Sequence, residues 1–372
     1  MPFSYPTFRP HPLIRGGHLQ TIAGTYLPSR TELTPVQVRV LLPDGDTIVL
    51  HDDGPPPLAG TKPGPGPSEQ PDNPIALLVH GLGGSHQSGY MRRASQKLRA
   101  RGIHVFRMDL RGCGAGLALA RHPVNAGRSE DLSVVLTHLI QHYPDSPIHL
   151  VGFSMGANIV LKLVGELAST APQNLASVLA VSPPMDLAEC SRNMQSAHGV
   201  LYDRVFVRGL ITHLKQRSAL VPDAHTLPLE PWPRRLAEFD DVFTAPLCGY
   251  AGVHDYYARA SSAPLLGRIS VPTLIIAATS DPIVPVRIFE RGTYSDTTQV
   301  VIAPCGGHLG FIAKRGADAD LRWMDWRIVE WVTSQAAPAS ALPVSHHTEY
   351  RSMNGDAARV VRGIERSGDK IH

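Results

Sequence analysis

Six short apolar runs alternate with segments of helical periodicity between residues 75 and 335, and this alternation constrains the fold more than any other feature. Near-continuous apolar runs of this length are typical of strands that are buried on both faces. The runs are 75–79, 103–108, 148–153, 177–182, 272–278 and 298–303, and helical patterns lie near 87–101, after 129, after 154 and around 321–331. Strand and helix in alternation predict a mainly parallel sheet covered by helices on both faces.

Four stretches depart from this alternation. Residues 36–51 alternate apolar and polar side chains on either side of Asp44-Gly45, which predicts an antiparallel hairpin leading into the sheet. Residues 186–265 interrupt the pattern with mixed helix and loop, the expected place for a helical lid. Residues 53–74 are rich in proline and glycine, which predicts a surface loop. Residues 336–372 read as a polar tail, so we expect one domain over residues 1–335.

Composition argues against several functional classes. The formal net charge is only +3 and the basic residues are scattered, so the basic stripe typical of nucleic-acid binding is missing. The four cysteines are far apart with no CxxC spacing, which argues against a zinc site and a disulfide framework. The start of the chain lacks a signal-peptide pattern, and no apolar stretch approaches the ~20 residues of a membrane helix. We therefore expect a cytoplasmic protein without a transmembrane segment.

Ser154 lies in the sequence Gly-Phe-Ser-Met-Gly, between the apolar run 148–153 and a helical pattern. The G-x-S-x-G motif in this strand-turn-helix context places a nucleophilic serine on a sharp turn above the sheet. Glycines two residues to either side make room for the strained backbone of that turn. The alternative is an ordinary serine N-cap with glycines nearby by chance. The flanking elements favour the nucleophile.

The stretch LLVHGLGGS, residues 77–85, predicts a donor for a developing oxyanion. An acyl transfer needs amides aimed at the carbonyl oxygen that becomes negative. We expect the backbone N–H groups of Met155, directly after the serine, and of Leu82, in the loop after an earlier strand. A plain glycine-rich turn is the alternative, and a phosphate cradle is a weaker one because the Walker lysine is missing. His80 reads as a loop-ordering residue.

His308 and Asp281 are the expected partners of Ser154. His308 follows the last predicted strand, where Gly306-Gly307 allow the loop to fold back over the sheet. Asp186 and Asp281 both follow strands between residues 154 and 308. Asp281 is preferred because Pro282 biases it towards an extended conformation at the strand end. The order Ser154, Asp281, His308 is that of α/β-hydrolases.

The chain resembles the YheT-like branch of the α/β-hydrolase superfamily from about residue 8 to 335. The resemblance rests on ordered motifs: HPLIRGGHLQTI, VHGLGGSHQSGYMR, DLRGCGAG, GRSEDLSVVL, VGFSMGAN, LAEFDDVFTAPLCGYAGVHDYY, SDPIVP and GGHLGF. It implies the α/β-hydrolase fold and a serine esterase or lipase-like activity without a cofactor or metal. It also implies a charge relay on Ser154, Asp281 and His308, which strengthens Asp281 over Asp186. The role of FDDVFTAPLCGY does not follow from the residues, and a structural role in anchoring the lid is the favoured interpretation.

These observations predict a serine hydrolase that cleaves small-molecule esters or lipids with short to medium acyl chains. One interpretation of residues 200–214 is an apolar face of the lid over the pocket, and the alternative is an ordinary core helix; the residues of this face are Leu201, Val205, Phe206, Leu210 and Leu214. One alternative is an acyltransferase, in which an alcohol rather than water resolves the acyl-enzyme. Another is a non-catalytic binding protein of the same fold.

Overall fold

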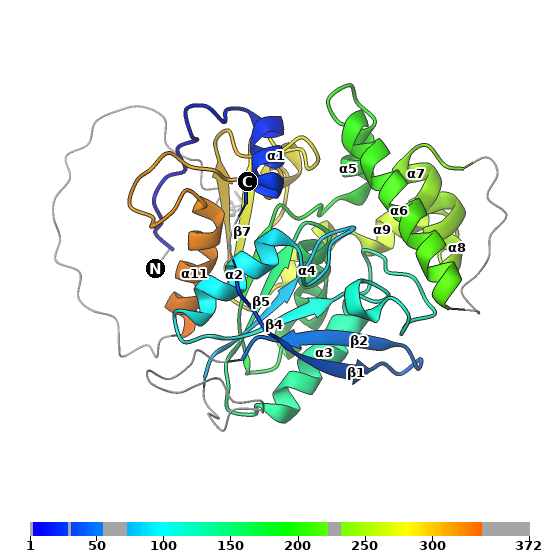
Figure 1. Cartoon of the computed structure of the whole chain (residues 1–372), viewed down its shortest axis with the longest axis horizontal. Helices are drawn as coiled ribbons and strands as arrows, with labels where there is room; N and C mark the ends of the chain where they lie inside the picture. The colour runs from blue at the N-terminus through cyan, green and yellow to red at the C-terminus, as the bar shows by residue number, and fades with distance from the viewer. Residues whose placement is uncertain (1–2, 29–30, 55–72, 222–231, 337–372) are drawn as a thin grey trace, which may run out of the picture.

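Eight strands form one sheet in the order β1-β2-β4-β3-β5-β6-β7-β8 (Figure 1). The computed structural model describes residues 3–28, 31–54, 73–221 and 232–336. The strands are β1 (Val36–Leu41), β2 (Thr47–Asp52), β3 (Ile75–Val79), β4 (His104–Asp109), β5 (Ile148–Phe153), β6 (Leu175–Val181), β7 (Thr273–Ala278) and β8 (Thr298–Ala303). All six predicted apolar runs are therefore strands, with small shifts at their ends.

The sheet is parallel from β4 to β8, and only β2 runs against its neighbours. The hairpin of β1 and β2 is antiparallel, and β2 also pairs antiparallel with β4. From there β4, β3, β5, β6, β7 and β8 pair in parallel. The six parallel strands therefore present their carboxyl ends at one edge, where the loops that follow them gather.

Helices cover both faces of the sheet, as the alternation predicted. On β3 the side chains of Ile75, Leu77 and Val79 join one core cluster, whereas Ala76 and Leu78 join the other, because successive residues of a strand face opposite sides. The first face is covered by α3 (Ser129–His142) and α4 (Met155–Leu167). The second is covered by α2 (Gly89–Arg99) and α11 (Trp323–Ala336).

A helical segment lies between β6 and β7, where the sequence predicted an insertion. Its elements are α5 (Leu187–Met194), α6 (Val200–Leu220), α7 (Leu236–Phe239), a π-helical turn (Asp240–Thr244), α8 (Ala245–Leu247) and α9 (Val253–Ala260). Figure 1 shows them gathered on one side of the molecule, opposite α11. The segment therefore adds a structure of its own beside the sheet.

The remaining helices are short or lie near the N-terminus. They are α1 (Gly17–Tyr26), α10 (Arg287–Glu290) and 3₁₀ turns at Gly114–Gly116, Ala168–Thr170 and Ala263–Arg268. None of the described helices is both long enough and apolar enough to cross a bilayer. The expected surface loop at 53–74 and the expected tail at 336–372 fall almost entirely outside the described residues.

Candidate active site

Ser154 stands on a strained turn between β5 and α4. Its φ of 51° and ψ of −121° are a backbone conformation that residues with a side chain rarely adopt. A Cβ on Gly156 would lie 2.4 Å from the carbonyl oxygen of His80, and one on Gly152 would lie 2.5 Å from Cα of Ala157. Ser154 occupies the N-cap position of α4, but its side chain makes no capping hydrogen bond. The geometry therefore differs from that of an ordinary serine N-cap.

The Ser154 hydroxyl points instead to His308, and His308 in turn contacts Asp281. Ser154 Oγ lies 2.8 Å from His308 Nε2, and His308 Nδ1 lies 2.9 Å from Asp281 Oδ2. A carboxylate can only accept, so Nδ1 carries the proton and donates it to Asp281. The neutral imidazole then accepts at Nε2 from the serine hydroxyl. Three predicted residues from distant segments thus meet at the carboxyl ends of the strands.

The two candidate aspartates have different surroundings. The buried Asp281 accepts from the backbone amides of Ile283 (2.8 Å) and Val284 (3.0 Å) through Oδ1, which leaves Oδ2 for the histidine. Asp186 is the N-cap of α5 and accepts from the amide of Glu189 at 2.9 Å. Asp186 therefore has a local structural task, and only Asp281 reaches His308.

Helix α1 holds the His308 loop in place, which the sequence reasoning did not foresee. The amide of His308 donates to Thr21 Oγ at 2.9 Å, and the Thr21 hydroxyl donates to the carbonyl of Gly17 at 2.7 Å. A Cβ on Gly307 would lie 2.4 Å from that same Gly17 carbonyl oxygen, so only glycine allows this approach. The signal was present in the HPLIRGGHLQTI motif, but its contact partner lies 287 residues away along the chain.

Leu82 and Met155, whose amides are the expected oxyanion donors, line a cavity together with Ser154. Within the part of the chain that the structure describes, neither amide donates a hydrogen bond to another residue. The loop that carries Leu82 is ordered by the buried His80, which donates from Nδ1 to the Gly81 carbonyl at 2.7 Å and accepts at Nε2 from the amide of Leu110. Burial lowers the pKa of His80 and keeps it neutral. His80 thus has the loop-ordering contacts that its position predicted.

Hydrogen bonds to Asp109, the last residue of β4, hold the far end of this loop against the sheet. They come from His51 and His86. These three side chains have the composition of a metal site, and their ligand atoms lie within 4.8 Å of one another. Asp109 accepts from both imidazoles, from the amide of His86 at 2.7 Å and from the amide of Ala115 at 2.9 Å. Burial acts to raise the pKa of Asp109, but these hydrogen bonds outweigh it and hold that pKa well below its usual range. The carboxylate is thus satisfied by protein donors.

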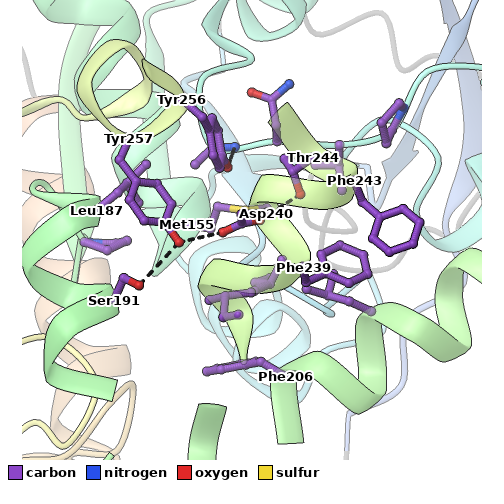
Figure 2. Close-up of a pocket in the computed structure, with 18 of the residues that line it drawn as sticks. Met155, Leu187, Ser191, Phe206, Phe239, Asp240, Phe243, Thr244, Tyr256 and Tyr257 are labelled. Carbon is purple, nitrogen blue, oxygen red and sulfur yellow. Dashed lines mark hydrogen bonds between the residues drawn. The ribbon is translucent and has the colours of Figure 1, made fainter. Parts of the chain in front are cut away.

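Two cavities meet at Ser154, and both are lined by Leu82, Phe206 and Ile283. The smaller, of about 110 Å³, extends under the helical segment and is mostly apolar (Figure 2). The larger, of about 480 Å³, contains His308 and opens between α1 and α6. The five predicted lid residues divide between them: Leu201, Val205 and Phe206 line the larger cavity, and Phe206, Leu210 and Leu214 the smaller.

Asp240 brings a carboxyl group into the apolar smaller cavity (Figure 2). It accepts from the hydroxyls of Thr244 (2.7 Å) and Tyr257 (2.8 Å), and the Tyr257 hydroxyl lies 3.4 Å from Ser191 Oγ. Burial raises the pKa of Asp240 to about 7, and the two hydroxyl donors offset part of that rise. The FDDVFTAPLCGY motif thus supplies a buried acid that joins the π-helical turn to α9 and α5.

Replacing Asp240 with asparagine will change how stability depends on pH. The folded pKa of about 7 lies above the ordinary value of 3.8, so the folded protein keeps a proton that the unfolded chain releases. Below pH ~4 both states hold this proton, and as pH rises from ~4 through ~7 the folded protein loses stability on the order of 4 kcal/mol. An asparagine side chain at this position mimics the neutral acid at every pH. Urea unfolding at pH 5 and pH 8 should show Asp240→Asn gaining stability relative to the unmodified protein as pH rises.

The matched control is Asp241→Asn, because Asp241 is the next residue and is exposed. We expect it to keep the pH dependence of the unmodified protein. A difference between Asp240→Asn and the unmodified protein that stays constant from pH 5 to pH 8 would contradict the assigned protonation.

The fold and these motifs agree with known proteins. A model of the α/β hydrolase fold matches residues 74–314. The "Putative esterase YheT" of Escherichia coli (strain K12) is 30% identical over 322 residues, 85% of this chain and 90% of that protein. Phospholipase ABHD3 of Mus musculus is 25% identical over 242 residues, 64% of this chain and 58% of that protein.

Among solved structures, the esterase Pf2001 of Pyrococcus furiosus has the same fold. It superposes with a TM-score of 0.51 at 16% identity, over 90% of this chain and 100% of that one. The family expected from the sequence motifs is confirmed by the family model and by the YheT protein. The chain therefore belongs to the α/β hydrolase family, in its YheT-like branch, and is a carboxylic ester hydrolase.

Proposed function

We propose that Ser154, His308 and Asp281 are the catalytic triad of this hydrolase, with the amides of Leu82 and Met155 as its oxyanion hole. The observation that carries the proposal is the continuous pair of hydrogen bonds, 2.8 Å from Ser154 to His308 and 2.9 Å from His308 to Asp281. This geometry lets a neutral imidazole take the serine proton while a carboxylate holds the required tautomer. A fluorophosphonate should label the protein on Ser154, and labelling elsewhere or not at all would contradict the triad.

The reaction proceeds in two acyl-transfer steps. Ser154 Oγ attacks the ester carbonyl carbon as its proton passes to His308 Nε2, and the carbonyl oxygen becomes negative between the two amides. The C–O bond to the alcohol breaks as His308 returns the proton to the leaving oxygen. Water then loses a proton to His308 and attacks the acyl carbon, and His308 returns that proton to Ser154 Oγ as the bond between Ser154 and the acyl group breaks and the acid leaves. Each amide donor contributes roughly 3 kcal/mol to the transition state.

The two cavities receive different halves of the ester. The leaving alcohol must accept its proton from His308, so it lies in the larger cavity, which His308 lines. The acyl chain then extends past Met155 into the smaller cavity, whose lining includes Leu187, Phe206 and Phe239 (Figure 2). An apolar site of limited volume favours short to medium acyl chains. The described helices of the segment between β6 and β7, from α5 to α9, line this cavity and act as the lid.

A series of p-nitrophenyl esters of rising acyl length tests this assignment. We expect kcat/KM to pass through a maximum at short to medium chains and then fall. Leu187→Trp narrows the smaller cavity and should move the maximum towards shorter chains, with losses of about tenfold or more for longer ones. The matched variant Ile22→Trp, in the larger cavity, should leave the acyl preference in place. Equal effects of the two variants on acyl preference would contradict the assignment.

Acyl transfer to an alcohol is the second candidate, because the larger cavity lies on the side from which the resolving nucleophile approaches the acyl-enzyme. It uses the same acyl-enzyme and differs only in what attacks it. With ethanol present in the ester assay, accumulation of the ethyl ester ahead of the free acid would assign the protein to transfer. Free acid as the main product supports hydrolysis.

A further inference from the structure

Exposed apolar side chains are frequent on α1, on the residues just before it and on α6, and both of these helices line the larger cavity. On the α1 side, Leu13 is 83% and Tyr26 78% exposed, and on α6, Leu201 is 65% exposed. Single exposed apolar residues are ordinary, but a cluster around a site is not. We call this cluster the apolar rim: Leu13, Leu19, Ile22, Tyr26, Leu201 and Val205. Most of the large apolar side chains exposed in the described part of the chain lie on these two segments.

The two halves of the apolar rim form one surface. The ring of His18 on α1 stacks on that of Tyr202 on α6, with His18 Nδ1 3.0 Å from the Tyr202 hydroxyl. The cavity between them is lined by Ile22 and Tyr26 from α1 and by Leu201 and Val205 from α6, and it ends at Ser154 and His308. Four residues of the apolar rim, Ile22, Tyr26, Leu201 and Val205, therefore border the larger cavity.

The exposed charged side chains on the two segments that carry the apolar rim are basic. Residues 3–28 contain no aspartate or glutamate, and Arg15 is exposed there. On α6 the exposed charged residues are Arg204, Arg208 and Lys215. The single acid of that helix, Asp203, is buried and accepts from the amide of Leu236. The surface thus combines apolar side chains with basic groups.

We propose that the apolar rim docks on the surface of an anionic phospholipid bilayer, so that a lipid ester enters the larger cavity directly from the membrane. Apolar side chains insert at the boundary between headgroups and acyl chains, while arginine and lysine attract anionic headgroups. A protein partner would be expected to need complementary acidic groups and a fixed shape, whereas a bilayer requires only this combination of apolar area and positive charge. The proposal deepens the proposed ester hydrolysis by naming where the substrate is collected.

Sedimentation with vesicles tests the docking. The full chain with Ser154→Ala, which leaves vesicle lipids intact, is mixed with vesicles of phosphatidylcholine alone or containing phosphatidylglycerol. We expect binding to the anionic vesicles that is several-fold stronger than to the neutral ones and that weakens with added salt. Adding Leu13→Asp and Leu19→Asp should lower the partition coefficient about tenfold or more.

The matched control is Val36→Asp with Leu41→Asp on β1, because these side chains are 56% and 71% exposed and lie away from the mouth. It should leave vesicle binding unchanged, and circular dichroism checks that both double variants are folded. Equal losses from the two double variants, or no binding to anionic vesicles, would overturn the docking. So would binding of the apolar rim to a protein when vesicle binding is absent.

Two separate measurements distinguish a failure of the docking proposal from a failure of the proposed catalytic function. Leu13 and Leu19 do not line either cavity, so their aspartate variants in the Ser154 protein should hydrolyse a water-soluble ester at the unmodified rate. Hydrolysis of that ester without vesicle binding would remove the docking and leave the proposed function. Vesicle binding without hydrolysis of that ester would remove the proposed function and leave the docking.

Discussion

Replacing Ser154 with alanine will lower kcat/KM for carboxylic esters by about 10⁴-fold or more. The variant lacks the oxygen that would form the acyl-enzyme. Any hydrolysis that remains above the uncatalysed rate then comes from substrate binding in the two cavities and from the amides of the proposed oxyanion hole. Alanine keeps the Cβ and therefore the backbone strain at φ 51°, so the unfolding midpoint should stay close to that of the unmodified protein. The measurement is hydrolysis of a p-nitrophenyl ester together with thermal unfolding.

Ser182 offers a matched control for Ser154. It follows β6, the strand next to β5, also has a positive φ of 47°, and its buried hydroxyl has no hydrogen-bond partner among the described residues. Ser182→Ala should therefore keep the activity, and its stability should be equal or slightly higher. Substantial turnover by Ser154→Ala, at more than about a hundredth of the unmodified rate, would remove Ser154 from the proposed role.

Replacing Asp281 with asparagine will lower kcat by about 10³- to 10⁴-fold while the chain remains folded. The asparagine amide group can donate to His308 Nδ1, which favours the tautomer with the proton on Nε2. That nitrogen then faces the Ser154 hydroxyl as a donor and cannot take its proton. The loss should therefore fall on kcat, measured over a range of ester concentrations, and KM should change much less.

Asp186→Asn is the corresponding control, because Asp186 also follows a strand between residues 154 and 308. Asparagine caps a helix about as well as aspartate, so the bond from the amide of Glu189 can be kept. We expect nearly unchanged activity and stability. A larger loss of kcat in Asp186→Asn than in Asp281→Asn would reverse the assignment of the acid.

Part of the site was predictable because its signals are local. The turn at Ser154 requires small residues at 152 and 156, and the loop after β3 needs the glycines that follow His80, so short motifs identify both. The strand pattern was equally clear, since a buried parallel strand must be apolar along its whole length. The choice of Asp281 over Asp186 was less direct, because both aspartates follow strands and only the path of the chain brings one of them to His308.

Other features depend on contacts that no local pattern records. Thr21 accepts from the His308 amide, although nothing near either residue indicates the pairing. The FDDVFTAPLCGY motif was visible in the sequence, but the raised pKa of Asp240 depends on burial by helices from several segments. The predicted apolar face of 200–214 was read as one surface, whereas α6 divides it between the two cavities and leaves Leu201 and Val205 exposed.

The sequence by itself determined the order of strands and helices, the turn at Ser154 and the glycine-rich loop after β3, because each depends on residues within a few positions of one another. Only the tertiary structure decided how Ser154, Asp281 and His308 meet, which residues line each of the two cavities and which apolar side chains of α1 and α6 are exposed. Those features are distances between segments that are remote in the chain. They arise from the packing of the whole sheet and its helices, which no single segment encodes.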